Sequence, residues 1–236
     1  MRHKISLLIV FMITILFISA CSVSSGDNGE YPYGHFEDDK MIGNVWEVSR
    51  NTNSIVVDIS YWEKRDSKGP NLNSEGYSYS AKLSKDTKIK NEDGSKASIG
   101  DIKKGQKVLV NPPRGNEFEG YADEIVLLEM SYKEKYSRLL SHLDGFNIVV
   151  MFEDGEKLPE EWQDSIYGEV LKVLEGTEHK AVAAWVPYGE NYVVDYKEEL
   201  QIEQMPVILV FNQEKLLYKF YNVDDLYDYF KSMNDQ

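Results

Sequence analysis

"IEQMPVILVFN", residues 202–212, sets Pro206 directly before 207–211, the most apolar strand-like run beyond the first twenty residues. A buried strand pairs nearly every backbone N–H, and proline has none to offer. Proline is tolerated at the first residue of a strand, where it removes the fewest ladder hydrogen bonds. An X–Pro bond is cis in only about 5% of folded cases, and a tight turn usually places it. The stretch therefore predicts a buried strand over 206–211 that is entered through a turn at Pro206.

Before this strand, the chain from residue 131 onward changes to helical spacing. One helical face is formed by Tyr132, Tyr136, Leu139, Leu140 and Leu143. Gly145 is placed to end that helix, and the apolar run 146–152 predicts a buried strand. After a turn at 153–157, apolar residues recur at every fourth position: Leu158, Trp162, Ile166, Val170 and Leu174. This spacing predicts a second helix, with Pro159 in its first turn and Gly176 at its end.

The remaining elements follow from the same patterns. Residues 180–186 predict a strand, 191–202 a helix or helical turn, and 206–211 and 215–221 two strands joined by a hairpin. The last helix starts at Asn222, a capping residue with Asp225 three positions on. Strands that first alternate with helices and then form a hairpin predict a mixed sheet with helices on both faces.

Taken together, 131–236 resembles the thioredoxin fold, in which a cis-proline precedes the third strand beside a Cys-x-x-Cys motif. Here "EDGEKLPEEW", residues 153–162, stands where that motif belongs, and it holds carboxylates and no thiol. Disulfide exchange needs one thiolate to attack and a second to resolve. The resemblance therefore implies a redox-inactive thioredoxin-like domain that keeps a peptide groove beside Pro206. The candidate ligand groove consists of Asp154, Glu156, Pro159, Met205 and Pro206.

Residues 41–130 have a different character and predict a small β-barrel. Five β-rich segments, separated by Gly, Asn, Asp and Pro, lie at 42–48, 54–60, 76–83, 107–111 and 121–130. Five short strands in so short a segment suggest a closed or partly open barrel. The arrangement resembles an OB-like domain that recurs in uncharacterised lipoproteins of Gram-positive bacteria. The expected fold class is therefore α+β with two domains, an OB-like barrel at 41–130 and a thioredoxin-like α/β domain at 131–236.

The first forty residues predict export and anchoring. Arg2 and Lys4 precede an uncharged apolar run, 5–18, that is shorter than the roughly 20 residues a membrane-spanning helix needs. Residues 1–20 therefore read as a signal peptide, and 18–21, "ISAC", resembles a bacterial lipobox. That resemblance implies acyl chains such as palmitate on Cys21; the alternative is a secretory signal with an incidental cysteine. Residues 21–40 predict a flexible tether at the extracytoplasmic face of the cell membrane.

Charge and composition exclude several functions. Without Arg2 and Lys4, 24 of the 26 basic residues remain against 40 acidic ones, a net charge of −16. This charge argues against nucleic acid as a partner of the folded part. The four histidines, at positions 3, 35, 142 and 179, show no metal-ligand spacing, and no cofactor motif is present.

Three functional hypotheses remain. The first is a non-enzymatic lipoprotein that binds or scaffolds an envelope peptide or protein. The second is a cell-wall glycan-binding module that uses an aromatic barrel surface of Tyr61, Trp62, Tyr77 and Tyr79, residues that also suit cross-strand packing. The third is a carboxylate-dependent wall enzyme that uses two acids of 153–161, although acids at a helix start are more simply explained by the helix dipole. The sequence favours the first hypothesis.

Overall fold

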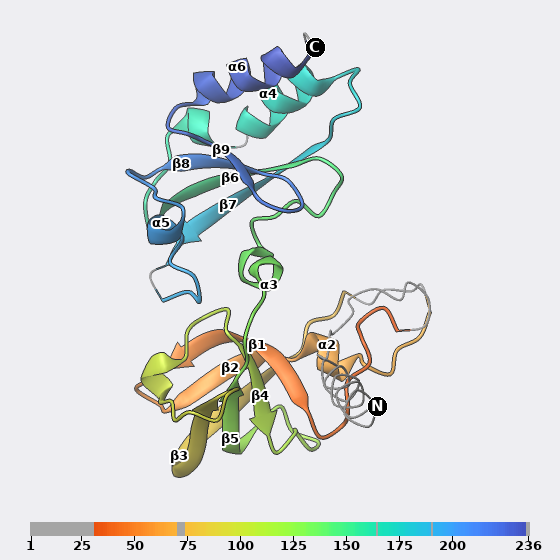
Figure 1. Ribbon diagram of the computed structural model, residues 1–236, viewed down its shortest axis with the longest axis vertical. Coiled ribbons are helices and arrows are strands. Elements are labelled where there is room, and N and C mark those ends of the chain that lie inside the picture. The colour runs from red at the N-terminus through yellow and green to blue at the C-terminus, as the bar shows by residue number, and fades with distance from the viewer. Residues whose placement is uncertain (1–30, 70–73, 164, 190, 235–236) are drawn as a thin grey trace, which may run out of the picture.

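The computed structural model describes residues 31–69, 74–163, 165–189 and 191–234, which form a closed five-stranded barrel and a separate four-stranded sheet with helices (Figure 1). The α+β fold class is therefore confirmed. The predicted signal peptide, Cys21 and the first part of the predicted tether lie outside the described residues. Among the described helices, none is long and apolar enough to cross a membrane.

The barrel contains the five predicted strands. They are β1 (Met41–Ser49), β2 (Ser54–Asp58), β3 (Ser78–Asn91), β4 (Lys107–Asn111) and β5 (Glu119–Leu127), with helix α2 (Ser60–Glu63) after β2 and a 3-10 turn η1 (Ile99–Asp101) before β4. The barrel closes in the order β1-β2-β3-β5-β4. The β3–β5 pair is parallel and the other pairs are antiparallel. Alternate side chains point inward, so Ile55 and Val57 of β2 are both fully buried.

β3 is longer than the sequence pattern predicts, because it continues past a bulge. Its pairing with β5 shifts register between Leu83 and Lys88, so the bulge interrupts the alternation that marks a strand. Beyond it, β3 ends in a turn at 91–94, where the Gly94 N–H donates to the Asn91 carbonyl (2.9 Å) and Gly94 has φ +85°. Only glycine adopts this backbone conformation without strain.

The second sheet has the order β7-β6-β8-β9, with a parallel β6–β7 pair and antiparallel β6–β8 and β8–β9 pairs. Its strands are β6 (Phe146–Glu153), β7 (Ala181–Tyr188), β8 (Val207–Phe211) and β9 (Leu216–Phe220). Its helices are α3 (Tyr132–Tyr136), α4 (Ser165–Leu174), α5 (Tyr196–Glu199) and α6 (Val223–Asn234), with a 3-10 turn η2 (Glu160–Trp162). The predicted mixed sheet and its element order are confirmed.

Helices cover both faces of this sheet, which explains why every residue of β8 is buried. α4 and α6 pack on one face, where Ile208 and Val210 meet Ile166 and Phe230 (Figure 1). The other face carries α3 and α5, and there Leu209 and Phe211 pack in one cluster with tyrosines of these helices, Tyr136 and Tyr196. The peptide bond between Met205 and Pro206 is cis, and Pro206 directly precedes β8.

Two predicted helices are shorter than expected. The predicted helix through Leu143 is wrong beyond Tyr136, because the chain turns there and brings Leu139 and Leu140 into the core as part of a loop. The buried Asn147 side chain holds that loop by donating from Nδ2 to the Leu139 carbonyl at 2.9 Å. Likewise, α4 begins at Ser165, and Trp162 reaches the core on the α4 and α6 face of the sheet from η2.

The barrel and the second sheet contact each other through backbone hydrogen bonds. The Lys104 N–H donates to the Asn191 carbonyl (2.9 Å), and the Val193 N–H donates to the Lys104 carbonyl (2.7 Å). Lys107 of β4 also pairs with Glu134 of α3 at 2.6 Å. At the far end of the barrel, the Trp62 indole donates to the Glu37 carbonyl at 3.2 Å, so packing begins within the predicted tether.

Candidate functional site

The predicted ligand groove lies at one end of the second sheet. Val207 pairs with Met151, so Met205 and Pro206 stand beside the carboxyl end of β6, from which the loop at 154–159 leaves. Met205 and Pro206 are half-buried, and Met205 packs against the face that carries α3 and α5. The structure therefore brings both predicted segments to the same end of the sheet.

The acidic part of the groove is an exposed turn. Asp154, Glu156 and Pro159 are all exposed. Gly155 has φ +81°, and Glu156 accepts a hydrogen bond from the Glu153 N–H at 3.2 Å, so its carboxylate closes the turn. Within the described residues, no hydrogen bond or ion pair joins this turn to Met205 or Pro206.

One carboxylate beside this turn already has a cationic partner. Glu153 pairs with Lys197 at 3.1 Å, and no group of three His, Cys, Asp or Glu side chains there could hold a metal ion. The arrangement fits a turn whose acids are exposed to solvent.

The predicted aromatic surface needs a correction. Trp62 and Tyr79 are core residues, only 4% and 3% exposed, because Trp62 packs from α2 into the barrel core and Tyr79 points inward from β3. Tyr61 is 61% exposed, whereas Tyr77 is half-buried and stacks on Phe118 with ring centroids 6.0 Å apart. Two of the four residues are therefore unavailable to a glycan.

An ion pair sits next to these aromatics. Arg114 donates to Glu63 from Nε (2.8 Å) and Nη2 (2.5 Å), and its guanidinium lies 3.9 Å from the centroid of the Phe118 ring. Both charged side chains are largely buried, and the hydrogen bond from Arg114 holds the pKa of Glu63 below its usual value. The pair links α2 to the β4–β5 loop, a structural role that leaves no unpaired charge for a ligand.

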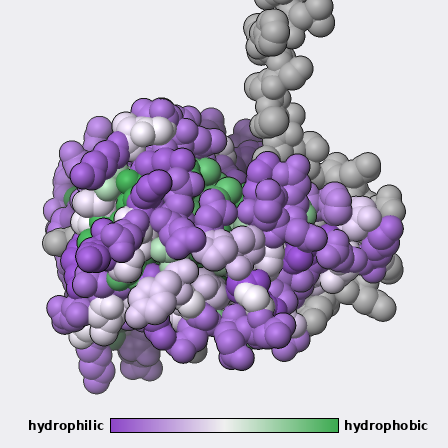
Figure 2. Space-filling view, turned by 90° about the horizontal axis from the view of Figure 1, so that it is seen from below, coloured by the Kyte–Doolittle hydropathy of each residue, from purple (hydrophilic) through white to green (hydrophobic). Residues whose placement is uncertain are grey.

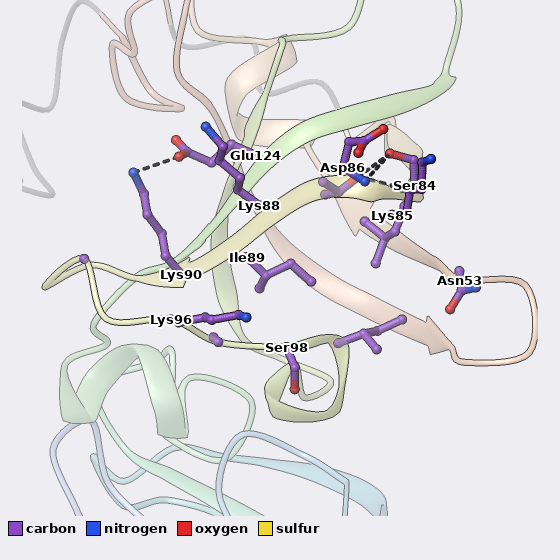
Figure 3. Close-up of a pocket in the computed structure, with 15 residues that line it drawn as sticks. Asn53, Ser84, Lys85, Asp86, Lys88, Ile89, Lys90, Lys96, Ser98 and Glu124 are labelled. Atoms are coloured by element: carbon purple, nitrogen blue, oxygen red, sulfur yellow. Dashed lines mark hydrogen bonds and ion pairs between the residues drawn. The ribbon is translucent and has the colours of Figure 1, made fainter.

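A further feature, which the sequence patterns did not predict, is a hollow of about 890 Å³ on the side of the barrel (Figure 3). We call it the lysine hollow. Its apolar lining consists of Leu83, Ile89, Ala97 and Ile99, and its charged lining consists of Lys85, Asp86, Lys88, Lys90, Lys96 and Glu124. Its volume is in the range of small-molecule sites, roughly 300–1,000 Å³.

One signal for this hollow was present in the sequence. Residues 82–96 hold five lysines, Lys82, Lys85, Lys88, Lys90 and Lys96, in a chain whose net charge is −14. The residue pattern of this segment predicts secondary structure, but it does not indicate a function for the lysines. The bulge in β3 and the hairpin after it bring four of them, Lys85, Lys88, Lys90 and Lys96, around one hollow, whereas Lys82 pairs with Glu119 outside it.

The sequence matches no protein-family model and no curated protein, so the sites described here rest on geometry and chemistry.

Proposed function

We propose that this chain is an exported lipoprotein, anchored through Cys21 at the extracytoplasmic face of a membrane, whose folded part binds a peptide or protein partner. Support for the anchor comes from the basic start, the short apolar run and the "ISAC" sequence of residues 1–21. Support for binding comes from the second sheet. Its strand order, its single parallel pair and its cis Met205–Pro206 bond before β8 are the features of a thioredoxin-like domain.

The absence of redox chemistry follows from composition. The chain has one cysteine, Cys21, far from the second sheet in the sequence. Without a thiol pair, this domain cannot exchange disulfides. In the same framework we assign the barrel as OB-like, which its strand order β1-β2-β3-β5-β4 supports.

The proposal of a peptide site rests on the unused hydrogen-bonding groups of the Met205 backbone. Among the described residues, its N–H and C=O make no hydrogen bond, although the neighbouring strand β8 is fully paired into the sheet. A half-buried residue with an unused backbone donor and acceptor can pair with an extended peptide, as in β-strand addition. The exposed turn at 154–157 lies at the same end of the sheet and would contact basic residues of such a peptide.

Replacement of Met205 by proline tests this site, because it removes the backbone N–H. Peptides would be selected from a random library on the protein from residue 22 onward. We expect Met205→Pro to weaken their binding about tenfold, since the peptide carbonyl would lose its donor. Binding is measured by fluorescence anisotropy with labelled peptides.

Met205→Leu is the matched control, because it keeps the N–H and an apolar side chain. Its affinity for the selected peptides should stay within about threefold of that of the unchanged protein. Far-UV circular dichroism verifies that both variants are folded. Equal binding by Met205→Pro and Met205→Leu, or failure to select any peptide, would contradict the peptide site.

The anchor is tested separately by mass spectrometry of the N-terminal peptide of protein isolated from a bacterial membrane. We expect that peptide to begin at Cys21 and to carry the mass of acyl chains, since two or more chains are needed for stable anchoring. Cys21→Ala should release the protein from the membrane fraction. An unmodified cysteine at this position would contradict the anchor and leave the peptide site unaffected.

A further inference from the structure

The lysine hollow is built on two rigid pieces of backbone. One is the hairpin after β3, where the Ala97 N–H donates to the Ile89 carbonyl (3.0 Å) and the Asn91 N–H donates to the Ser95 carbonyl (2.8 Å). These bonds fix Ile89 and Ala97 as neighbouring parts of the apolar lining. The hollow therefore has a shape that does not depend on a ligand.

The other piece is the bulge at 84–87. The Ser84 N–H donates to Thr87 Oγ1 (2.9 Å), and that hydroxyl donates to the Ala122 carbonyl of β5 (2.6 Å). The Leu83 N–H donates to the Asn53 carbonyl at 2.7 Å, which ties the bulge to the β1–β2 turn. The bulge thus holds Lys85 at the edge of the hollow.

The charges around the hollow divide into paired and unpaired groups. Lys90 pairs with Glu124 at 2.8 Å, and this hydrogen bond is the largest cause of the lowered pKa of Glu124. Figure 3 shows Lys88 and Lys90 on the Glu124 side of β3, whereas Lys96 extends beneath Ile89. Within the described residues, Lys85, Lys88 and Lys96 make no ion pair, although the charge of Lys88 helps to lower the pKa of Glu124.

The net charge of the residues that line the lysine hollow is opposite in sign to the net charge of the whole protein. The lining holds four lysines against Asp86 and Glu124, a local charge of +2, while the chain carries −14. Figure 2 shows the barrel end of the molecule, where hydrophilic residues cover most of the surface around a smaller group of hydrophobic ones. A local positive charge in a protein of net charge −14 would attract an anion to the hollow.

We propose that the lysine hollow binds a small organic anion, a phosphate or carboxylate attached to an apolar ring or chain. The apolar body would lie on Leu83, Ile89, Ala97 and Ile99, and the anionic group would meet Lys85 on the bulge or Lys96 on the hairpin. Lysine binds phosphate as a point charge without the fixed geometry of arginine, so the hollow accepts either head group. The site is on the barrel and is independent of the peptide site at Met205.

The test uses probes that separate the head group from the apolar body. 2-Naphthyl phosphate, 2-naphthoate, 2-naphthol and inorganic phosphate are titrated into the protein at low ionic strength, and binding is followed by calorimetry. We expect saturable binding of one or both naphthyl anions, at least tenfold tighter than that of 2-naphthol or inorganic phosphate. Comparison of the two anions identifies the preferred head group. Binding of the anions should weaken as salt is added.

Lys85→Gln/Lys96→Gln should weaken anion binding about tenfold, because each exposed charge contributes a modest attraction and tenfold corresponds to about 1.4 kcal/mol. The control is Lys133→Gln/Lys180→Gln, which makes the same charge change at exposed sites outside the barrel and should alter binding less than twofold. Equal losses in the two double variants would overturn the site, because they would assign the effect to net charge. Binding of 2-naphthol as tight as that of the anions would also overturn it.

Discussion

Phe211→Ala is expected to lower the free energy of unfolding of the second sheet by about 3–5 kcal/mol. Phe211 is fully buried, pairs with Asn147 and Leu216 through the backbone, and packs in the cluster that joins β8 to α3 and α5. Its truncation removes apolar contacts and leaves a cavity that the paired strands cannot close. Since a domain is stable by only about 5–15 kcal/mol, this variant should unfold at a much lower urea concentration.

The measurement is urea unfolding followed by circular dichroism and tryptophan fluorescence. Trp162 and Trp185 pack in the second sheet, and Trp62 packs in the barrel core, so single-tryptophan versions can report each part. Tyr218→Ala is the control, because this aromatic residue on β9 is 48% exposed and should cost less than about 1 kcal/mol. A loss in Phe211→Ala no larger than in the control would contradict the assigned core.

The same part of the chain shows what sequence patterns could predict. Pro206 and the apolar run after it predicted a buried strand entered through a turn, and β8 is buried throughout; the cis form of the Met205–Pro206 bond was implied by the fold resemblance alone, and the structure has it. Asn222 was predicted as a helix cap, and the Asp225 N–H donates to its Oδ1 at 2.9 Å while its Nδ2 donates to the Asp225 carboxylate at 2.7 Å. The buried strand and the helix cap are local features, because a short run of residues carries the whole signal.

Features that depend on distant contacts were not predictable from the same patterns. Leu139 and Leu140 have helical spacing after Tyr136, but Asn147 accommodates them in a loop through one buried hydrogen bond. The sequence predicts Trp62 as part of an aromatic surface, but in the closed barrel its side chain packs in the core. The lysine hollow needed the bulge in β3, since an uninterrupted strand would place its side chains strictly on alternate faces.

Gly43→Ala is expected to destabilise the barrel by about 3 kcal/mol, at the upper end of the usual cost of overpacking. A Cβ atom at Gly43 would lie 2.3 Å from the Asp58 carbonyl oxygen and 2.6 Å from Val57 Cγ1. The Asp58 oxygen belongs to the backbone of β2, so β1 and β2 would have to separate. Because β1 also pairs with β4, with Gly43 opposite Val108, movement away from β2 would disturb the other side of the closed barrel.

Gly115→Ala is the matched control, because nothing lies within 4 Å of a Cβ built at that glycine. It should change the free energy of unfolding by less than about 0.5 kcal/mol. Urea unfolding compares the two variants, and hydrogen exchange of the β1 and β2 amides locates the damage. Exchange should accelerate in β1 and β2 of Gly43→Ala and stay unchanged in β6 and β8, because the clash lies within the barrel. Equal stability of the two alanine variants would mean that β1 and β2 do not approach as closely as barrel closure at Gly43 requires.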